Sequence, residues 1–137
     1  MRVLFANHTG ELAGAERSLL DLLEALDGRV SATVACPAGD LLDALRTRDH
    51  DVVEIPSTSL SFRLHPVHTP SGLSRLALAG LRLRRIARDL DADLIHANTE
   101  RAGLAAALAG LGGPPIVIHA RAPFPHGPAG RATSAAL

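Results

Sequence analysis

Three histidines stand just behind or inside short apolar runs of the 137-residue sequence: His8, His96 and His119. Histidine is the usual general base near neutral pH, so any of them could take a proton from a hydroxyl group. Arg121 follows closely after His119, and its guanidinium group suits a bidentate contact with a phosphate or carboxylate. These residue types favour chemistry on an anionic, hydroxyl-bearing substrate.

A glycine-bearing turn follows the first apolar run. Residues 8–17 read HTGELAGAER and lead into a segment with leucines at helical spacing. A strand, a glycine turn and a helix start, in that order, form an anion site, because backbone N–H groups and the helix dipole both face the turn. We expect Gly10 and Gly14 to allow positive φ angles and close approach of a ligand. Glu16 is expected to interact with the helix dipole rather than to act in catalysis.

Alternating patterns predict the elements that position these residues. Apolar runs predict strands at 2–7, 30–36, 51–55, 93–97 and 116–119, and helical spacing predicts helices at 15–26, 41–48, 73–90 and 101–111. Asp40 is the expected N-cap of the second helix, and Asn98 or Thr99 that of the fourth. The alternation predicts an α/β fold, a doubly wound, mostly parallel Rossmann-like sheet of about five strands with helices on both faces.

The order of the strands decides which loops meet. An order of 3-2-1-4-5, taken from the fold class, places a switch point between the first and fourth strands, where ligands bind at the carboxyl ends. His8, His96 and His119 would then lie on neighbouring strands. The residues after the fourth strand, Asn98, Thr99 and Glu100, would border the same place.

Composition excludes several functions. Formal net charge is zero and all 14 basic residues are arginine, which removes a general electrostatic case for nucleic-acid binding and every mechanism that needs lysine. The single cysteine, the short N-terminal apolar run and the lack of a long apolar stretch predict a cytoplasmic protein. The Arg-rich faces leave open an association with the inner face of a membrane.

Missing motifs exclude the common nucleotide folds. Gly10 and Gly14 have GxxxG spacing rather than GxGxxG, and Cys36-Pro37 stands where a dinucleotide site needs an acid. A P-loop is excluded without lysine, and no GxSxG nucleophile elbow occurs. The histidines are too far apart in sequence to favour a metal site, so we expect no metal and no cofactor.

Three motifs together resemble the N-terminal, acceptor-side domain of GT-B-fold glycosyltransferases of family 4. Residues 14–17, GAER, resemble the family's GG[AS]ER turn, with Ala13 in place of the first glycine. Residues 93–98, DLIHAN, resemble its D[LIV][LIV]H[AS][HN] strand, and residues 115–119, PIVIH, resemble its segment ending in histidine. The resemblance covers residues 1–121, a partial domain, and leaves residues 122–137 as a poorly ordered tail.

The resemblance implies a role for each matching residue. Gly14, and less directly Gly10, would lie near the donor phosphates. His119 would line the acceptor pocket and orient or deprotonate the acceptor hydroxyl. The remaining substrate-binding residues would be His8, His96, Asn98, Thr99, Glu100 and Arg121. The substrates would be a nucleotide sugar and an acceptor.

The sequence also departs from the family pattern. It contains no second domain with an E-x7-E segment, so we expect the chain to be truncated and inactive without a second-half polypeptide that binds the donor. Two alternatives stay open. One is a non-catalytic module that binds a ligand or docks a partner through the open edge formed by residues 116–118. The other is a small α/β enzyme that uses the three histidines directly.

Overall fold

The computed structural model describes residues 1–57, 69–108 and 113–120; the poorly ordered tail expected at 122–137 lies outside them. Five strands and four helices alternate along these residues. The strands are β1 (Arg2–Ala6), β2 (Ser31–Cys36), β3 (Asp51–Glu54), β4 (Leu94–Ala97) and β5 (Ile116–Ile118). The helices are α1 (Gly14–Ala25), α2 (Asp40–Thr47), α3 (Thr69–Asp89) and α4 (Glu100–Leu108).

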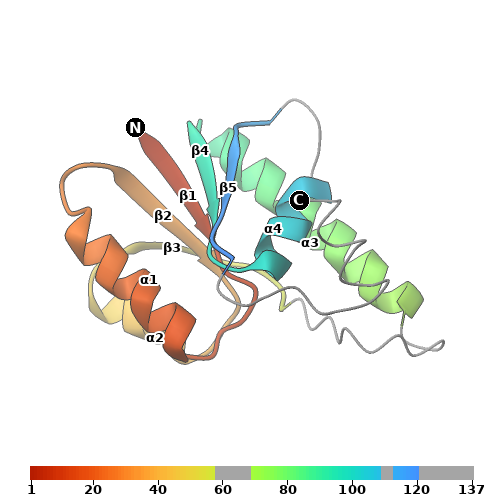
Figure 1. Ribbon diagram of the computed structural model, residues 1–137, viewed down its shortest axis with the longest axis horizontal. Coiled ribbons are helices and arrows are strands. Elements are labelled where there is room, and N and C mark those ends of the chain that lie inside the picture. The colour runs from red at the N-terminus through yellow and green to blue at the C-terminus, as the bar shows by residue number, and fades with distance from the viewer. Residues whose placement is uncertain (58–68, 109–112, 121–137) are drawn as a thin grey trace.

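The strands form one parallel sheet in the order β3-β2-β1-β4-β5, which confirms the expected order. Phe5 of β1 pairs with His96 of β4, and His96 pairs with Val117 of β5. The carboxyl ends of the strands converge on one edge of the sheet (Figure 1). The loops after β1, β4 and β5 therefore meet there, as the switch-point rule requires.

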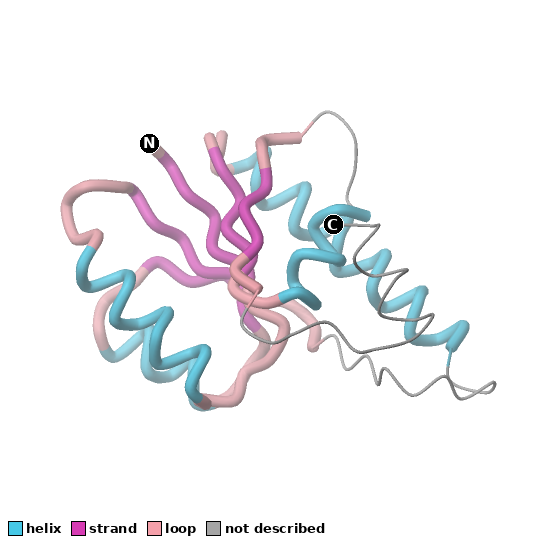
Figure 2. Tube along the Cα trace, viewed as in Figure 1, coloured by secondary structure: helices cyan, strands magenta, loops and turns pink. Residues whose placement is uncertain are grey.

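Each face of the sheet is covered by two helices (Figure 2). Side chains of a strand alternate between the faces, so Val3 and Phe5 of β1 pack with α1 and α2, while Leu4 and Ala6 pack with α3 and α4. Both clusters are apolar and buried. The two-sided burial explains why the strands read as continuous apolar runs rather than alternating ones.

Two helix starts differ from the expectation. Helix α3 begins at Thr69 rather than at 73, because Pro70 falls in the first turn, where no helical N–H bond is lost. Asp40 is the first residue of α2, and the N-cap is Gly39, whose φ of +144° favours glycine. Within the described part of the chain, no helix has the length and apolar character needed to cross a membrane.

Candidate functional site

The histidines lie at the carboxyl ends of adjacent strands, as expected. His96 belongs to β4 and is half-buried, with its ring centroid 5.0 Å from that of Phe5. His119 directly follows β5, is exposed, and has its ring edge-on to His96 at a centroid distance of 6.1 Å. The backbone N–H of His119 donates to the Ala97 carbonyl at 2.9 Å, which fixes its position beside β4. The sheet thus presents an imidazole to solvent at this edge.

His8 is joined to the residue that precedes α4. Its Nδ1 atom is hydrogen-bonded to Thr99 Oγ1 at 3.0 Å. Thr99 Oγ1 also accepts the N–H of Ala102 at 3.2 Å, so Thr99 is the residue that caps α4. Burial and the nearby positive charge of Arg101 lower the pKa of His8 below its ordinary 6.5. His8 is therefore neutral at neutral pH.

Three buried polar side chains connect β1, β4 and α1. The Asn98 amide donates to Asn7 Oδ1 at 3.0 Å and to the Ala15 carbonyl at 3.3 Å. The Asn7 amide donates to Glu16 Oε1 at 3.2 Å, and Glu16 Oε2 accepts the N–H of Ala13 at 3.2 Å. Asn7, Glu16 and Asn98 are each no more than 2% exposed. We call these three residues the switch-point network.

The network determines how α1 begins. Ala13 is the N-cap and has no side-chain oxygen, so the carboxylate of Glu16 is the side-chain group that binds the N-terminal backbone. Among the described residues, no hydrogen bond engages the N–H groups of Gly14 or Ala15. These first-turn donors are left for an external acceptor, as helix N-termini commonly are.

The two glycines of the turn have different surroundings. A Cβ atom on Gly10 would lie 2.1 Å from the carbonyl oxygen of Ala38, and the Gly10 carbonyl accepts the N–H of Leu41 at 2.9 Å. A Cβ atom on Gly14 would meet nothing within 4 Å. Neither glycine has a positive φ, so that expectation was wrong for both. Gly10 is required by packing between two loops, whereas Gly14 has open space where a side chain would be.

A pocket of about 310 Å³ opens at the carboxyl ends of β1 and β2. It is lined by residues 9–11, residues 37–40 and Ser57, and we call it the loop pocket. Its ionisable side chains are both acidic, Glu11 and Asp40. It is large enough for one small polar group.

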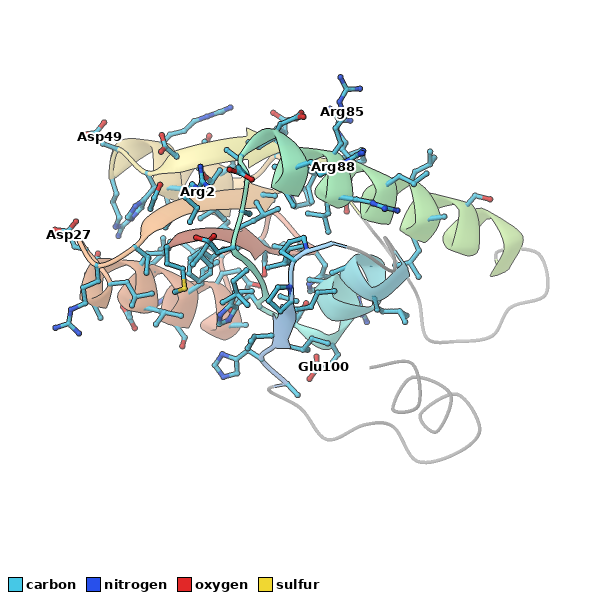
Figure 3. All side chains as sticks on the ribbon, turned by 90° about the horizontal axis from the view of Figure 1, so that it is seen from above. Arg2, Asp27, Asp49, Arg85, Arg88 and Glu100 are labelled. Carbon is cyan, nitrogen blue, oxygen red and sulfur yellow. The ribbon has the colours of Figure 1, made fainter. Side chains whose placement is uncertain are left out.

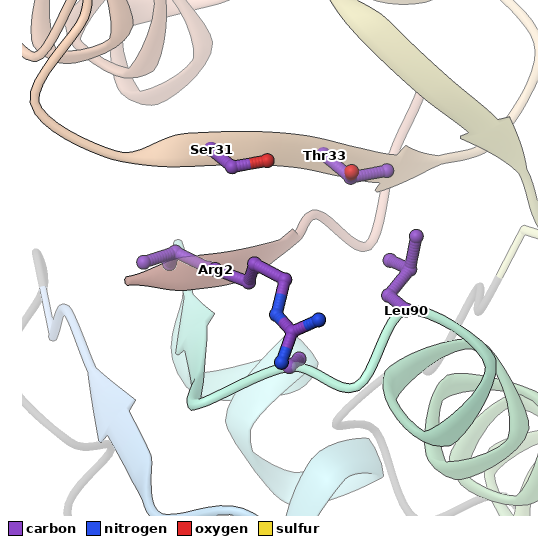
Figure 4. A pocket seen from close by; sticks show the side chains of 6 residues that line it. Arg2, Ser31, Thr33 and Leu90 are labelled. Carbon is purple, nitrogen blue, oxygen red and sulfur yellow. The ribbon is translucent and has the colours of Figure 1, made fainter.

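A second pocket, of about 40 Å³, lies at the opposite edge of the sheet (Figure 4). Arg2, Ser31, Thr33 and Leu90 are among its lining residues. The guanidinium group of Arg2 is held by Asp91 at 2.7 Å. This cavity is far below the size of a ligand site and lies away from the histidines, so we assign it no function.

The other predicted site residues differ in whether they could reach a ligand. Glu100 is the first residue of α4 and lies at its surface (Figure 3), where its charge favours the helix N-terminus. Asn98 is completely buried, so the structure gives it a supporting position in the switch-point network. Arg121 lies outside the described residues.

Sequence reasoning missed Asn7 and Gly39, and it missed the burial of Glu16. A signal for Asn7 was present: residues 3, 5 and 7 share one face of β1, which points residue 7 toward α1. The same alternation continues from His96 of β4 to Asn98, the residue directly after this strand. No local signal marks Gly39, because its constraint comes from Gly10 on another loop.

Comparison with known proteins gives one family. A family model described as Glycosyltransferase Family 4 matches residues 12–136. No curated protein matches the sequence at a significant level.

Solved structures share the fold. HepE from Anabaena, crystallised with UDP-glucose, superposes with a TM-score of 0.59 at 22% identity, over 91% of this chain and 30% of HepE. The same protein with UDP and glucose gives 0.56 at 21% identity, over 91% of this chain and 31% of HepE. A glycosyltransferase from Rickettsia africae ESF-5 gives 0.59 at 14% identity, over 85% of this chain and 28% of the other. The chain thus spans under a third of the length of these structures.

Proposed function

The chain belongs to glycosyltransferase family 4, and from that membership we propose that it forms the acceptor-side part of a GT-B enzyme. This enzyme moves a sugar from a nucleotide-sugar donor to an acceptor hydroxyl. The relatives it resembles in fold include one crystallised with UDP-glucose, which makes a UDP-sugar the first donor to test. No resident cofactor is needed, since the activated sugar is a substrate.

One observation carries the proposal: an open helix N-terminus and an exposed imidazole occur at the same edge of one sheet. The N–H groups of Gly14 and Ala15, which bond to no other described residue, offer donors to the phosphates of the donor substrate, aided by the α1 dipole. His119 is exposed and held at the end of β5, where it orients the acceptor hydroxyl or takes its proton. His96 packs edge-on against this imidazole and limits its orientation.

Other residues complete the acceptor side. His8 and Thr99 hold each other across the β1 and β4 loops and border the site, and Glu100 lies beside them. Neutral His8 can offer a hydrogen bond without adding positive charge. Arg121 remains the proposed anchor for an anionic group of the acceptor.

The chain spans under a third of the matching structures, so we propose that the nucleotide is gripped by a second domain supplied outside these residues. By itself the chain then shows little turnover. This is tested by mixing it with a donor-binding polypeptide encoded next to it and following sugar transfer from UDP-glucose and other nucleotide sugars. An EDTA arm of the assay checks that no metal is required.

The role of His119 is tested in the same mixture. His119→Ala should reduce transfer by about 10²- to 10⁴-fold, the range of general acid–base contributions. Val117→Ala, an exposed change on the same strand, is the matched control and should leave transfer nearly unchanged. Equal transfer by the His119 variant would refute its role. Absence of transfer with every donor would favour the second candidate, a binding module that uses the open edge of β5.

A membrane surface is the partner we propose for α3. Leu78 and Leu81 are 64% and 59% exposed and lie three positions apart on this helix, so that they are neighbours on its surface. Arg82, Arg85 and Arg88 are exposed near them, and Figure 3 shows Arg85 and Arg88 on the outer side of α3. Asp89 pairs with Arg85 at 3.7 Å. Apolar side chains beside net positive charge suit an anionic lipid surface.

Vesicle binding tests this partner. The chain should co-sediment with phosphatidylglycerol vesicles and not with phosphatidylcholine vesicles. Replacing both Leu78 and Leu81 with serine should abolish binding, whereas Ala77→Ser on the same face should not. Equal binding to both lipids would contradict an electrostatic contribution.

A further inference from the structure

Close backbone contacts between two loops form the loop pocket. Its floor is the contact between Gly10 and the 37–39 segment, where a Cβ atom on Gly39 would lie 2.6 Å from the Gly10 carbonyl oxygen. The Leu41 N–H donates to that same carbonyl at 2.9 Å. One wall is fixed by Thr9, whose carbonyl accepts the Asn7 amide at 2.8 Å. Preformed walls of this kind reduce the entropy lost on binding.

The loop pocket presents carboxylate and hydroxyl groups to a ligand. Glu11 and Asp40 are exposed, and among the described residues neither carboxylate has a hydrogen-bond or ion-pair partner. Thr9 Oγ1 accepts the Glu11 N–H at 3.2 Å, which leaves its own hydrogen to donate, and Ser57 adds a second hydroxyl. Carboxylates bind hydroxyl and ammonium donors strongly and repel phosphate.

The pocket is also separate from the proposed reaction centre. It lies at the ends of β1 and β2, whereas His119 follows β5. Two strand spacings separate β1 from β5 and three separate β2 from β5, which is roughly 10 to 14 Å at about 4.8 Å each. A sugar ring in the pocket therefore cannot place its own hydroxyl beside His119. Only a longer molecule reaches both places.

We propose that the loop pocket binds a neutral or amino sugar unit at the far end of an extended acceptor, and excludes a phosphorylated unit. The inference that the acceptor is extended depends on the proposed function, whereas the inference that the pocket binds a sugar unit depends on the pocket alone. The acceptor class is thereby an oligosaccharide or a glycoconjugate of more than one sugar unit.

Binding to the ¹⁵N-labelled chain by NMR tests the pocket without any catalysis. Glucose, glucosamine and glucose 6-phosphate are titrated separately. Glucosamine should shift the amide signals of Gly10, Gly39 and Ser57 at millimolar concentrations, with glucose weaker and glucose 6-phosphate weaker than glucosamine by about tenfold or more. Equal binding of the phosphorylated sugar, or no shift at these residues with any sugar, would overturn the proposal.

Variants of the two pocket carboxylates test whether these groups cause the preference for glucosamine over glucose 6-phosphate. Glu11→Gln and Asp40→Asn should each reduce the glucosamine preference by several-fold, and both are exposed changes that leave the fold intact. Asp43→Asn, an exposed acid in the same first turn of α2 but outside the pocket, should change nothing. A preference unchanged in both pocket variants would also overturn the proposal.

Transfer assays separate this proposal from the proposed function. If transfer occurs and the pocket variants leave the KM of a trisaccharide acceptor unchanged, the pocket is not an acceptor subsite although the enzyme assignment stands. If no transfer occurs but glucosamine binds as described, the pocket stands and the enzyme assignment fails.

Discussion

The side-chain amide of Asn98 donates to Asn7 Oδ1 across 3.0 Å, although 91 positions separate the two residues in the sequence. The side-chain amide of Asn7 in turn donates to Glu16 in the first turn of α1. The ends of two neighbouring strands and the first turn of a helix are thereby held by completely buried hydrogen bonds. Buried polar networks of this kind stabilise one geometry when every member has a partner.

Glu16→Gln should lower the free energy of unfolding by about 1–3 kcal/mol. Asn7 and Ala13 both donate to this carboxylate, and a glutamine amide can accept from only one of them while its NH₂ faces the other donor. Urea unfolding followed by circular dichroism measures the change.

Asp21→Asn is the control for Glu16→Gln, because it removes an exposed charge from the same helix. It should change the free energy of unfolding by less than about 0.5 kcal/mol. Equal effects of the two substitutions would show that the buried hydrogen bonds do not stabilise the switch point.

Periodicity predicted the sheet, but it could not predict this network. The apolar runs predicted all five strands, and the alternation with helices predicted their parallel arrangement; the strand order was taken from the fold class, and the structure has that order. The hydrogen bonds among Asn7, Glu16 and Asn98 depend on which strand ends become neighbours, which no local pattern contains. Glu16 was expected to interact only with the helix dipole, whereas it also accepts the side-chain amide of Asn7.

The surroundings of the two glycines in the turn likewise depend on contacts that no local sequence pattern contains. The sequence made both Gly10 and Gly14 candidates for ligand contact, Gly14 before Gly10, since both stand between a strand and a helix. The structure separates them, because Gly10 is packed against the loop after β2. That contact joins residues about 30 positions apart on loops with no shared pattern. The predicted juxtaposition of His96 and His119 succeeded because strand order alone determines it.

Gly10→Ala and Gly14→Ala should therefore have opposite effects on stability. The added methyl group of Gly10→Ala meets the Ala38 backbone at 2.1 Å, and the required shift should destabilise the fold by about 1–3 kcal/mol. Gly14→Ala meets open space at the first position of α1, so stability should be unchanged or raised by up to about 1 kcal/mol. Thermal unfolding measures both. A larger loss for Gly14→Ala than for Gly10→Ala would contradict the assignment of the packed glycine.

Cys36 should resist alkylation in the folded chain. The residue is completely buried in the cluster with α1 and α2, and burial raises the pKa of its thiol to about 11. The reactive thiolate is then scarce at neutral pH. Labelling by iodoacetamide at pH 7.5, followed by mass spectrometry, should be slow in buffer and fast in concentrated urea. Comparable rates in both solutions would mean that the thiol is accessible in the native state.

His8 should make folding stability depend on pH. Its pKa is lowered first by burial and then by Arg101, against the opposing charges of Glu16, Glu100 and Glu11. The native state therefore binds the proton more weakly than the unfolded chain, whose pKa is the ordinary 6.5. The stability contributed by neutral His8 is complete above pH 6.5 and is lost as the pH falls through the lower native value.

Urea unfolding of the wild type and of His8→Asn at pH 5 and 7.5 measures this pH dependence. The wild type should lose more stability at pH 5 than the variant. The NMR titration midpoint of His8 should lie below 6.5. A stability difference between the two proteins that stays constant with pH would show that His8 is as easily protonated in the native state as in the unfolded chain.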